Sequence, residues 1–146
     1  MTSSGHQRGR DGPSALVVGV DGSDTSWRAL YYALGLARRQ RSTVIAVFVI
    51  ATIGTYASVA IAPCLVNADL AEELERTVVA LAAEYGVATQ FLSLVGDPVS
   101  TLIRIATAEH ADALVLGASQ APGHRLFGSV AVRAVRRCRC PITVVP

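Results

Sequence analysis

Four short runs of aliphatic residues set the strongest limit on how this chain can fold. They are residues 15–20 (ALVVGV), 43–50 (TVIAVFVI), 113–116 (ALVL) and 142–145 (ITVV). Each run is continuous, which is typical of parallel strands whose two faces are both covered by helices. Residues 88–95 (ATQFLSLV) alternate apolar and polar side chains, which indicates a more exposed strand near the sheet edge. We therefore expect an α/β fold with a five-stranded parallel sheet.

Helical periodicity fills the segments between these strands. Residues 24–40 have the i, i+3, i+4, i+7 spacing of one apolar face, with Ser23 or Asp24 as the N-cap. A second helix is predicted over residues 67–85, a third after the N-cap Asp97 and Pro98, and a fourth over residues 128–138. Residues 51–63 are too apolar for an ordinary solvated loop, so we expect them to cover a site or to contact a partner.

The chain of 146 residues is interpreted as one domain over residues 15–146, because no linker or change of composition divides it. Residues 1–14 lack apolar periodicity and are rich in Ser, Gly and Arg, which predicts a disordered leader. This leader has no apolar stretch of the kind found in secretory signals. No apolar run reaches the roughly 20 residues that a membrane-spanning helix needs, so no membrane partner is expected.

Charge and cysteine content exclude several classes of function. The sequence contains no Lys, which excludes the lysine of a phosphate-binding P-loop, a Schiff-base lysine and a kinase-type lysine. The net charge is only +2, and the arginines at 133, 136, 137 and 139 end a predicted helix, where cations suit the helix dipole. We therefore expect no nucleic-acid partner.

Three cysteines, an odd number, argue against a disulfide framework and favour a reducing compartment. Cys138 and Cys140 are two positions apart, and the third, Cys64, is distant, so the spacing does not match a zinc site. Cys138 falls on the apolar side of its predicted helix. Buried packing is therefore its expected role.

A binding crevice is expected where the strand order reverses. With helices on both faces and an order of 3-2-1-4-5, the reversal lies between strands 1 and 4, and ligands bind at the carboxyl ends of the strands beside such a point. Asp21, Gly117 and the helix start at Gly128-Ser129 would then face one crevice, and the helix start favours an anion. Asp21 has an alternative role as a turn or capping residue.

Several of these motifs resemble one known family. The segments LVVGVDGS, GDP, ADALVLGAS and FGSVAVRAVRRCRCPITVVP are similar to those of universal stress proteins, and the resemblance covers residues 16–145. It implies the doubly wound sheet with order 3-2-1-4-5 and a cytoplasmic homodimer joined through the last strand. In one branch of the family it also implies an ATP-binding crevice.

The resemblance also implies which residues would hold the nucleotide. In that branch the aspartate after strand 1 contacts adenine, the end of strand 2 packs beside the base, and the glycine loop holds ribose and phosphates. Carried over residue by residue, these positions are Gly19, Asp21, Val49, Leu116, Gly117, Gly128, Ser129 and Val130. The branch signature is Gly, two residues, Gly, nine residues, then Gly with Ser or Thr. This chain has Gln120 at the second glycine and only seven residues before Gly128.

Two functions follow as hypotheses. The first is a module that binds ATP, with or without Mg²⁺, in stress response or signalling. The alternative is a homodimeric interaction protein of the same family that binds no nucleotide. Enzymatic activity is not expected, because the crevice offers no general base, no acidic pair for Mg²⁺ and no lysine clamp, and we predict neither catalytic residues nor a metal site. The apolar last strand would be an exposed edge, which predicts a homodimer through Pro141 to Val145 and leaves a further protein partner open.

Overall fold

The computed structural model describes residues 14–51, 61–119 and 129–146, apart from the side chains of residues 61–66 and of Ser129. The predicted leader up to residue 13, most of the predicted 51–63 loop, Gln120 and Gly128 lie outside this part of the chain. Strands and helices alternate as β1 (Ala15–Gly19), α1 (Asp24–Gln40), β2 (Thr43–Ala51), α2 (Ile61–Tyr85), β3 (Thr89–Gly96), α3 (Pro98–Ala108), β4 (Ala113–Gly117), α4 (Ser129–Arg137) and β5 (Ile142–Val145).

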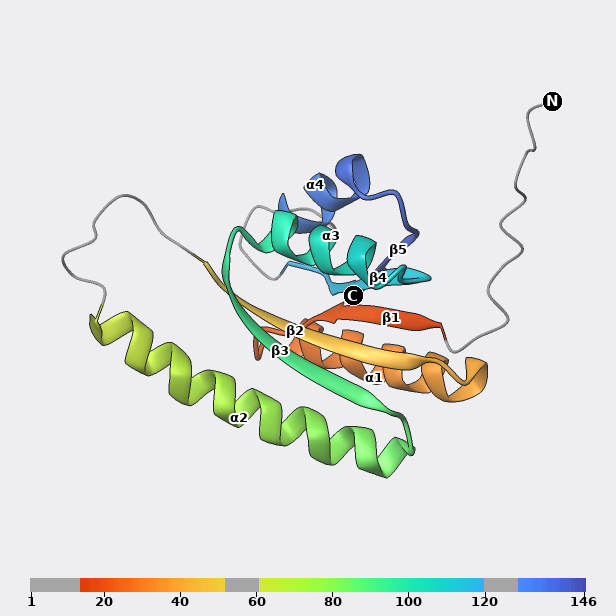
Figure 1. Cartoon of the computed structure of the whole chain (residues 1–146), viewed down its shortest axis with the longest axis horizontal. Helices are drawn as coiled ribbons and strands as arrows, with labels where there is room; N and C mark the ends of the chain where they lie inside the picture. Colours follow the sequence, from red (N-terminus) through yellow and green to blue (C-terminus); the bar gives the residue numbers. More distant parts are fainter. Residues whose placement is uncertain (1–13, 52–60, 120–128) are drawn as a thin grey trace.

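The five strands form one parallel sheet in the order β3-β2-β1-β4-β5, as predicted (Figure 1). Val17 of β1 is paired with Ile45 of β2 on one side and with Leu114 of β4 on the other. The chain first winds from β1 outward to β3 and then returns to β4, so the reversal lies between β1 and β4. This is where a crevice forms at the carboxyl ends of the strands.

Helices cover both faces of the sheet: α1 and α2 lie on one side, and α3 and α4 lie on the other (Figure 1). Successive strand residues point to opposite faces, so each strand contributes to two hydrophobic cores. Val18 packs with Leu30 of α1 and Val78 of α2, whereas Val17 packs with Val99 of α3. This two-sided burial explains why the strands lack an apolar-polar alternation.

The helix ends follow local rules. Ser23 is the N-cap of α1, and its hydroxyl accepts a hydrogen bond from the Ser26 backbone N–H. Asp97 is the N-cap of α3, where its carboxylate accepts from the Ser100 N–H at 2.9 Å, and Pro98 is the first helical residue. Asp97 was predicted as a cap and Ser23 as one of two candidates beside Asp24, because a side-chain oxygen satisfies an N–H that has no partner within the helix.

Several strand ends differ from the prediction by one residue, and two predicted helix ends were wrong. Helix α2 begins at Ile61 rather than at residue 67, so its first turn contains Pro63. A proline is tolerated there because the N–H groups of the first turn have no partner within the helix. Helix α4 ends at Arg137, so Cys138 follows the helix and is half-buried instead of packing on its apolar face.

In the described ranges, no helix combines the length and hydrophobicity that crossing a membrane requires.

Candidate functional site

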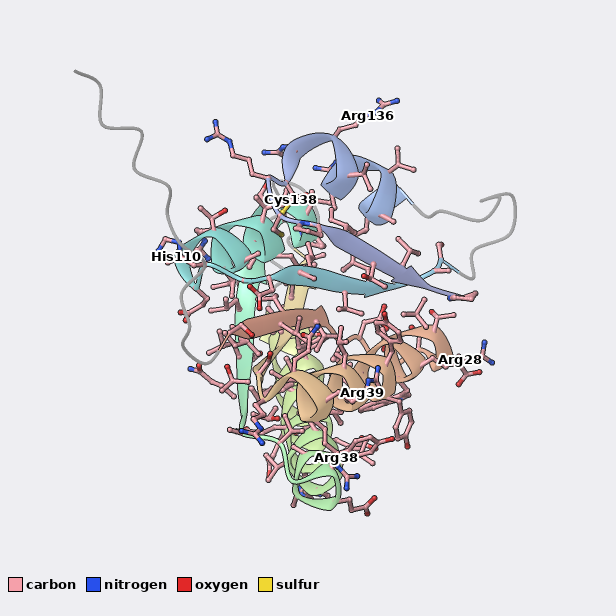
Figure 2. The ribbon with its side chains drawn as sticks, turned by 90° about the vertical axis from the view of Figure 1, so that its right-hand side faces the viewer. Arg28, Arg38, Arg39, His110, Arg136 and Cys138 are labelled. Atoms are coloured by element: carbon pink, nitrogen blue, oxygen red, sulfur yellow. The ribbon has the colours of Figure 1, made fainter. Side chains whose placement is uncertain are left out.

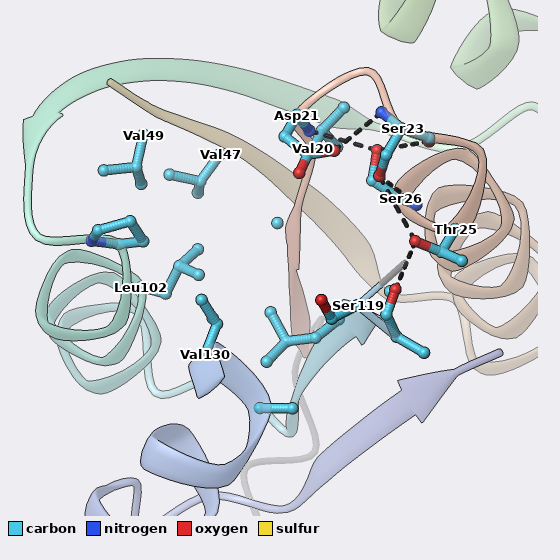
Figure 3. A pocket seen from close by; sticks show the side chains of 16 residues that line it. Val20, Asp21, Ser23, Thr25, Ser26, Val47, Val49, Leu102, Ser119 and Val130 are labelled. Atoms are coloured by element: carbon cyan, nitrogen blue, oxygen red, sulfur yellow. Dashed lines mark hydrogen bonds between the residues drawn. The ribbon is translucent and has the colours of Figure 1, made fainter. Parts of the chain in front are cut away.

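A cavity of about 310 Å³ opens at the carboxyl ends of β1, β2 and β4, on the sheet face covered by α3 and α4 (Figure 3). This is the place predicted from the strand order, and the volume falls within the range of small-molecule sites. The described residues that line it are Gly19, Val20, Asp21, Ser23, Thr25, Ser26, Val47, Val49, Pro98, Leu102, Leu116, Gly117, Ala118, Ser119, Val130 and Ala131.

One half of the cavity is apolar. Val47 and Val49 of β2, Leu102 of α3 and Val130 of α4 gather on the same side in Figure 3. Val47 and Leu102 belong to the hydrophobic core between the sheet and α3, so the core itself continues into the cavity wall. A flat apolar group placed here would be buried against aliphatic side chains.

The other half of the cavity carries hydroxyl groups from the start of α1 (Figure 3). The Thr25 hydroxyl donates to the Ala118 carbonyl at 2.7 Å, which ties α1 to the end of β4. The Ser26 hydroxyl donates to the Ser23 carbonyl at 3.0 Å and accepts from the Asp21 N–H at 3.3 Å. These bonds fix the polar wall before any ligand arrives.

Asp21 lies at the mouth of the cavity, two residues after the end of β1, and its side chain is exposed. Its Oδ1 atom accepts from the Ser23 N–H at 2.9 Å, which closes a turn that contains Gly22 at a φ of +86°. The turn role suggested by the sequence is therefore present. Within the described ranges the other carboxylate oxygen, Oδ2, has no hydrogen bond, so Asp21 can close the turn and also accept from a ligand.

Gly117 ends β4 where the strand meets the first turn of α1. A Cβ at this position would lie 2.5 Å from the Thr25 carbonyl carbon and 2.7 Å from the Ser26 nitrogen. Side-chain carbons essentially never approach backbone atoms this closely, so only glycine fits here. Gly117 is therefore needed for the packing of β4 against α1, whatever else it does for a ligand.

Helix α4 brings its N-terminal end to the cavity. The helix begins at Ser129, and Val130 and Ala131 of its first turn line the cavity wall. The free N–H groups of a helix start attract anions. An ion pair of 3.2 Å between Arg133 Nη2 and Asp97 Oδ2 joins α4 to the start of α3, which carries the cavity residue Pro98.

The ion pair also acts on the titration of Asp97. The backbone N–H and the hydroxyl of Ser100, followed by the Arg133 guanidinium, hold the pKa of Asp97 below its usual value. Its carboxylate therefore stays ionised in mildly acidic solution, and the contact between α3 and α4 is kept there.

The structure brings together most of the residues predicted from the sequence. Six of them line the cavity: Gly19, Asp21, Val49, Leu116, Gly117 and Val130. Ser129 is at the start of α4, and its side chain is outside the described part of the chain, as is the whole of Gly128.

Sequence reasoning did not assign Thr25, Ser26, Leu102 or Ser119 to the site. The hydroxyl-rich run DGSDTS directly after the first strand is a signal that points to Thr25 and Ser26. Leu102 had no such signal, because it has the spacing of an ordinary core residue on α3 and only the packing of α3 over β2 places it at the cavity.

The chemistry available in the described lining is limited. Asp21 is its sole charged side chain, and the remaining polar groups are hydroxyls and backbone amides. In the same described ranges, no three His, Cys, Asp or Glu side chains gather in a way that would hold a metal ion. The arrangement suits a ligand with a flat apolar part and several hydrogen-bonding groups.

Comparison with known proteins gives this site a family context. The model of the Universal stress protein family matches residues 14–146. The chain belongs to the universal stress protein family. A universal stress protein of Methanocaldococcus jannaschii is 31% identical to this family member over 137 residues, which cover 89% of this chain and 80% of that protein.

Solved structures of the family share the fold. UspA from Lactobacillus plantarum aligns with a TM-score of 0.79 at 24% identity, over 91% of this chain and 97% of that one. A universal stress protein solved in complex with cAMP aligns with a TM-score of 0.70 at 25% identity, over 91% of this chain and 97% of that one. Family structures from Archaeoglobus fulgidus and Arabidopsis thaliana contain dAMP and AMP, respectively.

Proposed function

We propose that this universal stress protein binds an adenine nucleotide, with ATP as its ligand, and acts as a cytoplasmic binding module in stress response or signalling. The observation that carries the proposal is the cavity at the strand-order reversal, which has one apolar half, one hydroxyl-bearing half and a helix start at its edge. Adenine nucleotides in several structural neighbours support the ligand class.

The two halves of the cavity match the two halves of a nucleotide. The adenine ring would lie against Val49 and Leu102, where burial of its faces is favourable. Asp21 at the cavity mouth would accept a hydrogen bond from the exocyclic amino group of the base, through the carboxylate oxygen that the turn does not use.

The phosphates would be bound without a lysine. The start of α4 presents backbone N–H groups and the positive end of its dipole, and the hydroxyls of Ser23 and Thr25 line the polar wall. If Mg²⁺ accompanies the nucleotide, the phosphates themselves would supply most of its ligands, since Asp21 is the only carboxylate in the described lining.

The same lining favours binding over catalysis, and we propose that the protein is not an enzyme. Among the described residues of the cavity, none is a His, Lys or Glu that would serve as a general base or clamp a transferring phosphoryl group. The alternative function, a homodimeric interaction protein without nucleotide, is favoured by Gln120 and by the two residues missing from the glycine loop.

We further propose that the protein is a homodimer joined through β5. The Leu114 and Ala118 N–H groups donate to the Pro141 and Val145 carbonyls, so alternate residues of β5 face β4. The backbone groups of Ile142 and Val144 then point away from β4, along a free sheet edge that a second copy would pair with.

Helix α4 extends this edge with apolar side chains. Arg133 and Arg137 contact Asp97 and Ser100 on the α3 side of the helix. Val132 and Val135 lie on the opposite flank of α4, toward the free edge, and are 39% and 61% exposed. A strand of a second copy that pairs with β5 would therefore also contact this apolar surface of α4.

Nucleotide binding is tested first on freshly purified protein. The protein is denatured and its supernatant chromatographed for nucleotide, and ATP, AMP and cAMP are then titrated calorimetrically into the stripped protein with and without Mg²⁺. We expect micromolar binding of at least one adenine nucleotide. Asp21→Ala should weaken it by at least about tenfold, the effect of one lost hydrogen bond to a charged group.

Asp112→Ala is the matched control, because this exposed aspartate precedes β4 at the amino-terminal end of the strands, opposite the cavity. It should leave binding unchanged. If no adenine nucleotide binds at millimolar concentration, the shortened loop has closed the site, and the interaction-protein function replaces the nucleotide-binding one.

The dimer is tested by sedimentation or light scattering at tens of micromolar. Val144→Pro removes an N–H that faces away from β4, and Val135→Glu places a charge on the exposed apolar surface of α4. Both variants should give the monomer mass. A monomeric parent protein, or dimers that persist in both variants, would exclude this interface.

A further inference from the structure

Two cysteine side chains meet between the end of α4 and the start of β5. Cys138 directly follows α4 (Figure 2). Cys140 precedes Pro141 and β5, and the sulfur atoms of the two cysteines are 2.9 Å apart. Both side chains are half-buried free thiols. The site is separate from the nucleotide cavity, because neither cysteine is among the described residues that line it.

The two sulfurs have different surroundings. Cys140 packs against the hydrophobic core between the sheet and α3, whereas Cys138 does not contribute to that core. Burial, together with the hydrogen bond to Cys138, raises the pKa of Cys140 to about 12. Cys140 therefore keeps its proton at neutral pH and can donate it to the neighbouring sulfur.

Cys138 is placed to react first. Its sequence neighbours Arg137 and Arg139 are both exposed. Cys140, in contrast, is held as a thiol, and a thiol is less reactive than a thiolate. Its side chain is only partly buried, so a small oxidant can reach it. A second thiol already in contact is the arrangement in which an oxidised cysteine is resolved.

We propose that Cys138 and Cys140 form a redox-modifiable thiol pair that closes into an intramolecular disulfide when the protein meets a peroxide. To reach the S–S bond length, the two sulfurs have to approach by only about 0.9 Å. The bond would join the end of α4 to the start of β5.

The chemistry takes two steps. The Cys138 thiolate attacks one peroxide oxygen, so an S–O bond forms, the O–O bond breaks, and hydroxide leaves with a proton from solvent as water. The Cys140 sulfur then attacks the Cys138 sulfenic acid, so the S–S bond forms and the S–O bond breaks. The departing hydroxide takes the Cys140 proton as a second water. Two electrons pass from the sulfurs to the peroxide.

The test uses the full chain with Cys64→Ser, so that only the pair remains. The protein is treated with hydrogen peroxide, its thiols are counted after denaturation, and its intact mass is measured. Trypsin cleaves after Arg137 and after Arg139, which separates the two sulfurs unless a disulfide joins them. We expect loss of both thiols, a mass decrease of about 2 Da, a fragment in which residues 138–139 are linked to residues 140–146, and full reversal by a dithiol reductant.

Single variants in the same background separate the roles of the two sulfurs. Cys140→Ser should leave Cys138 to oxidise further, with a mass gain of about 32 Da for the sulfinic acid. Cys138→Ser should slow thiol loss by roughly tenfold or more. Unchanged thiols in the paired protein, a sulfinic acid on the pair, or a disulfide between two chains would each overturn the proposal.

Discussion

The replacement Gly117→Ala tests the contact that positions the cavity. In the structure the end of β4 presses against the first turn of α1, and an alanine Cβ would sit 2.5 Å from the Thr25 carbonyl carbon. Ordinary contact begins at 3.4 Å, so the strand and the helix would have to separate by about 0.9 Å. The 2.7 Å hydrogen bond from the Thr25 hydroxyl to the Ala118 carbonyl spans this contact and would be strained by such a movement.

The cost follows from these two effects. Overpacking of this kind destabilises proteins by about 1–3 kcal/mol, and loss of one hydrogen bond adds about 1 kcal/mol. The two effects together amount to about 2–4 kcal/mol. Because the clash is with backbone and no side chain can rotate away, we expect no less than the middle of that range, about 3 kcal/mol. For a urea slope of about 2 kcal/mol per M, the unfolding midpoint should fall by about 1.5 M.

Gly35→Ala is the matched control. Gly35 lies inside α1, and a Cβ there would meet nothing closer than the end of the flexible Arg39 side chain at 3.6 Å. Alanine in a helix interior is favoured over glycine by about 0.8–1 kcal/mol, so this variant should be more stable than the parent. Urea unfolding followed by circular dichroism measures both. If Gly117→Ala unfolds at the urea midpoint of the parent or above it, β4 does not pack tightly against α1, and the contact that we describe at this cavity wall is wrong.

Further predictions concern the core, a helix cap and pH. Leu30→Ala removes a fully buried side chain and should cost about 2–5 kcal/mol by urea unfolding, whereas Tyr32→Ala, at a site 43% exposed, should change stability by about 0.5 kcal/mol or less. Ser23→Ala should cost about 1 kcal/mol by the same assay, because the Ser26 N–H loses its cap. Asp97→Asn keeps a capping side chain but removes the charge. Because the folded pKa of Asp97 is lowered, its carboxylate stabilises the fold above the unfolded pKa of about 3.9, and this contribution is lost as pH falls through the folded value. Urea midpoints measured at decreasing pH should therefore fall less steeply below about pH 4 in this variant than in the parent; equal slopes would show that the fold does not lower the pKa of Asp97.

Local sequence patterns were sufficient to predict the helices and strands and their order along the chain. Continuous aliphatic runs mark β1, β2 and β4 because a strand covered on both faces has no polar side, and Ser23 and Asp97 mark helix starts because their oxygens cap free N–H groups within three residues. These effects involve only neighbouring residues, so they can be predicted from the sequence. The start of α2 was missed because Pro63, usually a helix breaker, is harmless in a first turn.

Contacts between residues far apart in the chain could not be predicted in this way. The sequence around Gly117 does not show that a Cβ at this position would clash with the Thr25 carbonyl. In the same way, the sequence around Arg133 does not identify Asp97 as its ion-pair partner. Leu102 has the spacing of a core residue and becomes a cavity wall because α3 crosses the sheet beside the strand-order reversal. The Cys138 and Cys140 sulfurs approach each other in the short connection between the end of α4 and the start of β5. Such contacts depend on how helices and strands pack together. The periodicity of side chains along one helix or strand shows which face is buried, but it does not show which residues of another element contact that face.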